Sequence, residues 1–316
     1  MTELARRLEH LSETKRLALR RLLADKNAEA RLLELEGSSI KVLRQGTPKL
    51  FIFPATEGSV AYMNGYLPHI PAAWGVYGCQ TPGLDDEQKP ATRVEDIATQ
   101  AIRGIRSVQP RGPYYLAGNC MGGLPAFETA RQLEAAGETV AVLVHLMPAF
   151  ARSWREMPTA DALATRALID YGFIIERLLG RPVDLPMRRI VDAPEDQRAD
   201  VLVDFLSSLP ELAGVSRAEL HRRVDVYWAN LAAMFAYRPD GGVRTTFNVI
   251  SVGGVERGEQ IVDPDSPYAA ALRATPPDKV IIDHVDAEAS TLFDCAEPHM
   301  SAIGAVLHSA LSAAVR

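Results

Sequence analysis

One cysteine of the chain lies in a pattern that can carry out nucleophilic chemistry. Residues Gly118 to Gly122 read Gly-Asn-Cys-Met-Gly, which is the form Gly-x-nucleophile-x-Gly centred on Cys120. Glycines on both sides permit a sharp turn between a strand and a helix, and this turn holds the central side chain over the end of a sheet. The helix N-terminus behind the turn is expected to favour the thiolate. The competing interpretation is a buried structural cysteine at a tight turn.

The same turn predicts where a developing negative charge is stabilised. The backbone N–H of Met121, directly after Cys120, is one expected oxyanion donor. We expect the second donor in the loop that follows the apolar run Leu50–Phe53, and we assign it to the N–H of Ala55.

The surrounding pattern alternates strands with helices. A helix is expected to open at the capping box Thr92-x-x-Glu95. Another follows Cys120 and ends at Gly137. Strands alternating with helices predict a doubly wound, mainly parallel sheet. The apolar runs that predict its strands are Leu50–Phe53, Val76–Gly78, Tyr114–Ala117, Val140–Leu146, Phe247–Val252 and Val280–Val285.

Two segments stand apart from this alternation. Residues 151–240 hold about three helical segments and no convincing strand; the clearest helix is Ser216–Tyr237. Because ligands bind at the carboxyl ends of such strands, this insertion predicts a lid over that end. Residues 1–35 predict a helical extension, leaving one domain over residues 36–316.

Composition excludes several kinds of partner. The net charge is -6 with both signs interspersed, so nothing indicates binding to nucleic acid or to an anionic membrane. No apolar run approaches the ~20 residues of a membrane span, and the first residues lack the apolar stretch of a signal peptide. The cysteines have no metal-ligand spacing and no disulfide framework. We expect a cytoplasmic enzyme without metal or cofactor, in which Cys79 and Cys295 are bystanders.

Several segments resemble the thioesterases of nonribosomal peptide and polyketide synthases. The similarity extends over about residues 48–316 and is carried by Pro54–Ser59, Trp74–Gln80, Val94–Ala98, Gln109–Gly118, Ala126–Gly137, Val226–Asn230 and Tyr237–Pro239. This resemblance implies an α/β-hydrolase fold. It also implies a substrate acyl or peptidyl chain held as a thioester on the phosphopantetheine arm of an acyl or peptidyl carrier protein.

The chain departs from the pattern of that family at three catalytic positions. The family usually has serine where this chain has Cys120, although members with cysteine are known. Met147 stands where the aligned strand normally ends in the acid of a catalytic triad. Ala289 aligns with the histidine, so the histidine is lost, was replaced by engineering, or is supplied by a loop in another register.

Substitutes for the missing groups can be named. His284, at the end of the last strand, is our candidate base, and the alternative is a solvated histidine. Glu256, after the preceding strand, is our candidate acid, since many other α/β-hydrolases place their acid there. His299 is interpreted as the start of the final helix, and His145 as a satisfied core histidine.

A cysteine nucleophile also changes which release chemistry is favoured. The acyl-enzyme remains a thioester, so transfer from the carrier is close to isoenergetic and the carbonyl stays more electrophilic than that of an oxyester. Cysteine branches of the family include Dieckmann cyclases that release tetramates and pyridones, and aminoacyl shuttles. We expect release by cyclisation in natural-product (antibiotic) biosynthesis. An acyl shuttle, an editing hydrolase acting in trans, and a degenerate relative that only binds carrier or acyl chain remain alternatives.

Overall fold

The computed structural model describes residues 33–34, 39–85, 88–147, 160–179, 181–252, 266–285 and 299–315. The chain divides into two compact units. The helical unit comprises Met1–Leu32 and Pro158–Trp228, and the sheet unit comprises Leu33–Met157 and Ala229–Arg316. The predicted extension over residues 1–35 lies almost wholly outside the described residues and stays a prediction.

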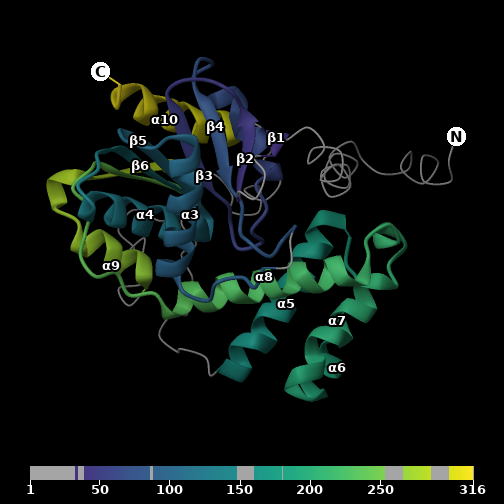
Figure 1. Cartoon of the computed structure of the whole chain (residues 1–316). Coiled ribbons are helices and arrows are strands. Elements are labelled where there is room, and N and C mark those ends of the chain that lie inside the picture. Colours follow the sequence, from purple (N-terminus) through teal and green to yellow (C-terminus); the bar gives the residue numbers. More distant parts are fainter. Residues whose placement is uncertain are drawn as a thin grey trace, which may run out of the picture. The chain divides into compact units, whose positions relative to one another are not determined.

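The sheet unit is built on eight strands in the order β1-β2-β4-β3-β5-β6-β7-β8 (Figure 1). The strands from β4 to β8 in this order are parallel, and β1 and β2 form an antiparallel edge. The predicted mainly parallel sheet is confirmed, and its antiparallel edge was not among the predicted strands. The bounds are β1 Leu33–Glu34, β2 Ile40–Arg44, β3 Lys49–Phe53, β4 Gly75–Cys79, β5 Tyr114–Asn119, β6 Val140–Leu146, β7 Phe247–Val252 and β8 Val280–Val285.

Helices cover both faces of this sheet. One face packs against α3 (Val94–Val108), α4 (Gly123–Ala135) and α9 (Pro267–Ala274). The other packs against α10 (His299–Ala313) and the 3₁₀ segment η1 (Ala61–His69). Alternate strand residues point to opposite faces, as a pleated strand requires. In β3, Phe51 and Phe53 join the first core and Leu50 and Ile52 the second.

In the sheet unit, the sequence predicted a helix end at Gly137 and a helix start at Thr92. α4 stops at Ala135, and Gly137 follows with a φ of +80°, a conformation that glycine adopts without strain. The capping box at Thr92 is wrong: α3 begins at Val94 with Arg93 as its N-cap, and no side chain caps it. The backbone of Arg93 is extended, as is usual for an N-cap residue, and the side chain of Thr92 takes no part in the cap.

The described part of the helical unit contains α5 (Ala160–Leu179), α6 (Met187–Asp192), α7 (Arg198–Ser207) and most of α8 (Arg217–Ala236). No strand occurs among described residues 160–236, so the predicted helical insertion is confirmed. Ser216 Oγ accepts from the N–H of Glu219, which confirms the cap of the last helix. The role of this insertion as a lid stays a prediction.

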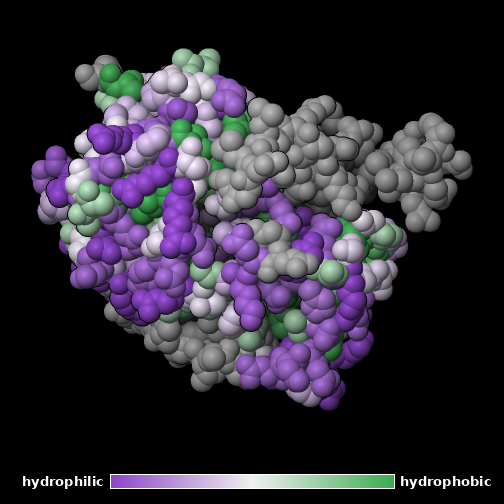
Figure 2. Space-filling model, in the orientation of Figure 1, coloured by the Kyte–Doolittle hydropathy of each residue, from purple (hydrophilic) through white to green (hydrophobic). Residues whose placement is uncertain are grey.

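Among the described residues, no helix combines the length and the apolar character needed to cross a bilayer. Hydrophilic residues cover most of the face seen in Figure 2, and apolar ones form small scattered groups.

Candidate active site

Cys120 occupies a strained turn at the carboxyl end of β5. Its φ is +51°, which residues other than glycine rarely adopt. A Cβ on Gly118 would lie 2.2 Å from the Gly122 carbonyl oxygen, and one on Gly122 would lie 2.1 Å from the Pro54 carbonyl oxygen. Only glycine therefore fits at these two positions. The predicted sharp turn from strand to helix is confirmed, and the nucleophilic role of Cys120 stays a prediction.

The Cys120 thiol does not have the ionisation expected of it. The residue is only partly exposed. Burial, together with the charge of Glu57, raises the pKa of the Cys120 thiol to about 12, although the N–H of Met121 acts in the opposite direction. The expected thiolate is therefore wrong, because burial outweighs the N–H groups at the start of the helix. At neutral pH the thiol keeps its proton, and attack by the sulfur requires that this proton leave.

The loop Pro54–Ser59, which carries the expected donor Ala55, lies beside this turn. It follows β3, whose last residue Phe53 pairs with Gly118. The carbonyl of Pro54 packs so closely against Gly122 that no side chain fits between them. The segments carrying Met121 and Ala55 are thus adjacent, as an oxyanion hole requires. Their role as donors stays a prediction.

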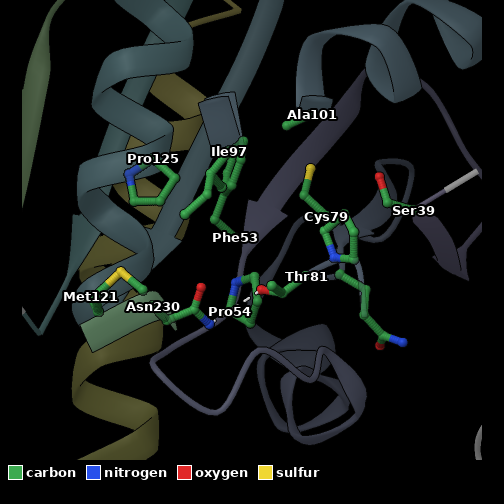
Figure 3. Close-up of a pocket in the computed structure, with 12 residues that line it drawn as sticks. Ser39, Phe53, Pro54, Cys79, Thr81, Ile97, Ala101, Met121, Pro125 and Asn230 are labelled. Atoms are coloured by element: carbon green, nitrogen blue, oxygen red, sulfur yellow. Dashed lines mark hydrogen bonds between the residues drawn. The ribbon is translucent and has the colours of Figure 1, made fainter. Parts of the chain in front are cut away.

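Asn230 of α8 holds the Pro54–Ser59 loop in place, a role that the sequence did not predict. Its Nδ2 donates to the Thr56 carbonyl at 2.9 Å and to Thr81 Oγ1 at 3.4 Å. Figure 3 shows Asn230 among Met121, Pro54 and Thr81 at the edge of a small cavity. An asparagine in the middle of an apolar helix face was the available signal, since a buried amide needs partners.

A buried histidine lies beneath the turn. His145 of β6 is 2% exposed, and its Nε2 is 2.7 Å from the carbonyl oxygen of Cys120. Because a carbonyl only accepts, Nε2 carries the proton. The Tyr268 hydroxyl donates to the same oxygen at 3.5 Å. The interpretation of His145 as a satisfied core histidine is confirmed, but the sequence did not indicate that its partner is the backbone of Cys120.

The structure does not bring His284 to Cys120. Successive pairings place Asn119 level with Leu146, Ile250 and Asp283, so Cys120 and His284, each one residue further on, lie at about the same level of the sheet. They are nevertheless separated by three strand spacings, about 14 Å, which an imidazole and a thiol cannot bridge. His284 is exposed on the edge strand β8. The hypothesis that it contacts the nucleophile directly is therefore not supported.

Met147, the residue at the position where an acid was expected, is among the described residues. Met147 directly follows β6 with a φ of +49°, and its N–H donates to the Ile250 carbonyl at 2.8 Å. It supplies no carboxylate. Glu256, Ala289 and Cys295 lie outside the described residues, so the acid and the loop after β8 stay predictions.

A second cysteine, Cys79, lies near the site. Cys79 is buried in the core beneath the Pro54–Ser59 loop, and burial raises the pKa of its thiol far above the usual value (Figure 3). Unlike the partly exposed Cys120, Cys79 is enclosed by the core and is not accessible to a substrate. Within the described ranges, no group of three His, Cys, Asp or Glu side chains is arranged to hold a metal ion.

A mainly parallel sheet with a strained cysteine turn at the carboxyl end of a central strand defines an α/β-hydrolase domain. Residues 48–189 match the family model described as "Thioesterase domain".

Individual relatives are similar over limited lengths. The chain is 30% identical over 220 residues to a probable non-canonical nonribosomal peptide synthetase, CymA, of Salinispora arenicola, covering 69% of this chain and 3% of the relative. It is 30% identical over 178 residues to aspulvinone E synthetase melA of Aspergillus terreus, covering 53% of this chain and 18% of the relative. The solved NocB thioesterase domain from the nocardicin cluster shares the fold, with 20% identity, a TM-score of 0.52, and coverage of 84% and 93% of the two chains.

Replacing Gly122 by alanine should destabilise the sheet unit. The new methyl group would meet the Pro54 carbonyl, and overpacking of this kind typically costs about 1–3 kcal/mol. Gly214→Ala is the control, because a Cβ there meets nothing within 4 Å. Urea unfolding measures both variants. Equal stability of the two would contradict the close approach of the loop to the turn.

The stability of the protein should fall in acid through His145. Burial lowers the pKa of His145 in the folded protein to about 4, whereas an unfolded histidine has a pKa of about 6.5. As the pH falls below ~6.5 the unfolded chain takes up the proton first, so stability is lost between about pH 6.5 and 4, in total on the order of 3 kcal/mol. His145→Leu should flatten this slope in urea unfolding measured across that range.

The control for that measurement is His308→Gln, which removes an exposed histidine from α10. An unchanged acid slope in His145→Leu would show that His145 is not the source of the loss.

Proposed function

We propose that this domain is an acyl-transfer enzyme that takes an acyl or peptidyl chain from a carrier protein onto Cys120 and releases it by cyclisation. One observation carries the proposal. The strained turn presents Cys120 at the end of β5, beside the N–H of Met121 and the Pro54–Ser59 loop. The thioesterase family match and the nonribosomal peptide and polyketide synthases among the relatives support a substrate held as a carrier-bound thioester.

The first half-reaction exchanges one thioester for another. The Cys120 sulfur attacks the carbonyl carbon, and the bond from that carbon to the phosphopantetheine sulfur breaks. The proton of Cys120 ends on the departing sulfur, so no proton is gained or lost overall. The N–H groups of Met121 and Ala55 stabilise the oxyanion that forms between these events. Because the pKa of the Cys120 thiol is raised to about 12, its proton must be removed before or during the attack.

The second half-reaction closes a ring. A carbanion formed within the bound chain attacks the thioester carbonyl, the new carbon–carbon bond forms, and the bond to the Cys120 sulfur breaks. The proton lost by the carbon acid ends on that sulfur, which restores the thiol. This Dieckmann-type step is again neutral in protons.

The geometry bears on the alternatives. A protein that only binds carrier or acyl chain has no use for a cysteine held at a φ of +51° between two obligatory glycines. An acyl shuttle would share the first half-reaction and pass the chain to a second carrier. An editing hydrolase needs a base to deprotonate water. Ring closure needs a base for its carbon acid just as hydrolysis does, and among the described residues no histidine ring nitrogen is placed against the Cys120 sulfur.

Cys120→Ala should abolish covalent acylation by an acylated carrier protein without unfolding the chain, because a residue at the tip of a turn contributes little to packing. Intact-mass spectrometry after mixing detects the adduct. Cys79→Ala is the control, and it should acylate as the parent does because Cys79 is buried in the core whereas Cys120 is partly exposed. Carrier-dependent turnover that persists in Cys120→Ala would contradict the nucleophile.

The same experiment separates the alternatives by product. Release of a cyclised product supports the proposal. Appearance of the acyl group on a second carrier identifies a shuttle, and the linear acid identifies a hydrolase. A parent enzyme that never carries an adduct is a binding protein.

A further inference from the structure

The peptide unit between Cys120 and Met121 is held from beneath by the sheet. Its carbonyl oxygen, that of Cys120, accepts from His145 Nε2 at 2.7 Å and from the Tyr268 hydroxyl at 3.5 Å. Its N–H, that of Met121, faces the Cys120 sulfur. In a trans peptide the C=O and N–H bonds point in opposite directions in one plane. Holding the oxygen beneath the turn therefore fixes the direction of the N–H above it.

The fit around the His145 ring shows that this contact is built into the fold. A Cβ on Gly123 would lie 2.0 Å from the ring, so only glycine at the start of α4 leaves room for it. His145 is paired in register with Gly118, which lets the ring pass beneath the turn. Phe247 and Tyr268 lie on either side, with ring centroids 6.4 and 5.0 Å from that of His145.

Burying a polar ring at this position costs free energy unless the ring makes a hydrogen bond. β6 is otherwise a run of Val, Ala and Leu, and the described neighbours of His145 belong to the apolar core. Leucine or phenylalanine would satisfy packing there without desolvating an imidazole. Among the described residues, the hydrogen-bond partner of the ring is the carbonyl of Cys120.

We propose that His145 is a positioning residue of the oxyanion hole: its Nε2–H aligns and polarises the Cys120–Met121 peptide, so that the Met121 N–H is aimed at the thioester oxygen. This inference rests on the proposed acyl transfer. Hydrogen bonds in series strengthen one another, so a donor on the carbonyl makes the N–H of the same peptide a better donor. His145 itself touches neither the substrate nor the sulfur.

The test compares two reactions of the same thiol in the full-length chain. Acylation by the hexanoyl thioester of N-acetylcysteamine passes through an oxyanion, whereas alkylation by iodoacetamide does not. His145→Phe keeps a ring of similar shape and removes the donor. It should slow acylation by about 30- to 100-fold and leave alkylation within about threefold of the parent.

Three further readouts distinguish positioning from packing. His145→Gln places an amide N–H near the position of Nε2 and should recover acylation to within about fivefold of the parent. The loss in His145→Phe should fall on the maximal acylation rate, with the half-saturating thioester concentration unchanged, because the oxyanion exists only in the transition state. Val249→Ala, a packing change in the strand beside His145, should affect neither reaction by more than about threefold.

Each outcome decides the matter. Acylation at the parent rate in His145→Phe overturns the inference, and so does an equal loss in both reactions, since that would mean a displaced thiol. If His145→Phe does not fold, His145→Leu takes its place, and failure of the Gln variant to exceed Leu in acylation overturns the inference. A parent that alkylates but never acylates overturns the proposed function, and this inference with it.

Discussion

The backbone at Cys120 is the constraint on which the rest of the site depends. A φ of +51° at a residue with a side chain is unfavourable, and it persists only where the surroundings fix it. Here Gly122 lets the Pro54 carbonyl pack against the turn, and Gly123 lets the His145 ring pass beneath it. Two segments far apart in the chain thus meet at one peptide. The arrangement that strains the cysteine also gathers the N–H groups around its sulfur.

The protonation of Cys120 connects this geometry to the chemistry of the site. A buried thiol with a pKa raised to about 12 is a weak nucleophile until its proton is removed. Exchange between thioesters returns that proton to the departing sulfur, and ring closure by carbon returns one to Cys120. Hydrolysis would return the proton of water to Cys120 in the same way. Each of these steps therefore needs a group that takes up the proton before the sulfur receives it.

Local signals in the sequence predicted the parts of the site that depend on local geometry. The glycines at 118 and 122 identified the turn because their spacing is itself the constraint. Ser216 identified a helix start because its cap bond spans three residues. The prediction of a thiolate at Cys120 was wrong because burial of this thiol depends on the whole fold. The contact of His145 was invisible for the same reason, since it joins residues 25 positions apart. For His284, sequence order gave the correct strand but not its distance from β5.

Met147 shows that the backbone at the acid position does not depend on an acid being there. Its φ of +49° is a conformation that Asp and Asn tolerate better than other residues with side chains. Met147 nevertheless adopts this conformation. Its N–H donates to the Ile250 carbonyl, so a hydrogen bond to the neighbouring strand β7 holds the turn. The position therefore keeps the shape that suits a carboxylate while supplying none. A base that deprotonates water, a thiol or a carbon acid must therefore take its orientation from a group other than the side chain of Met147.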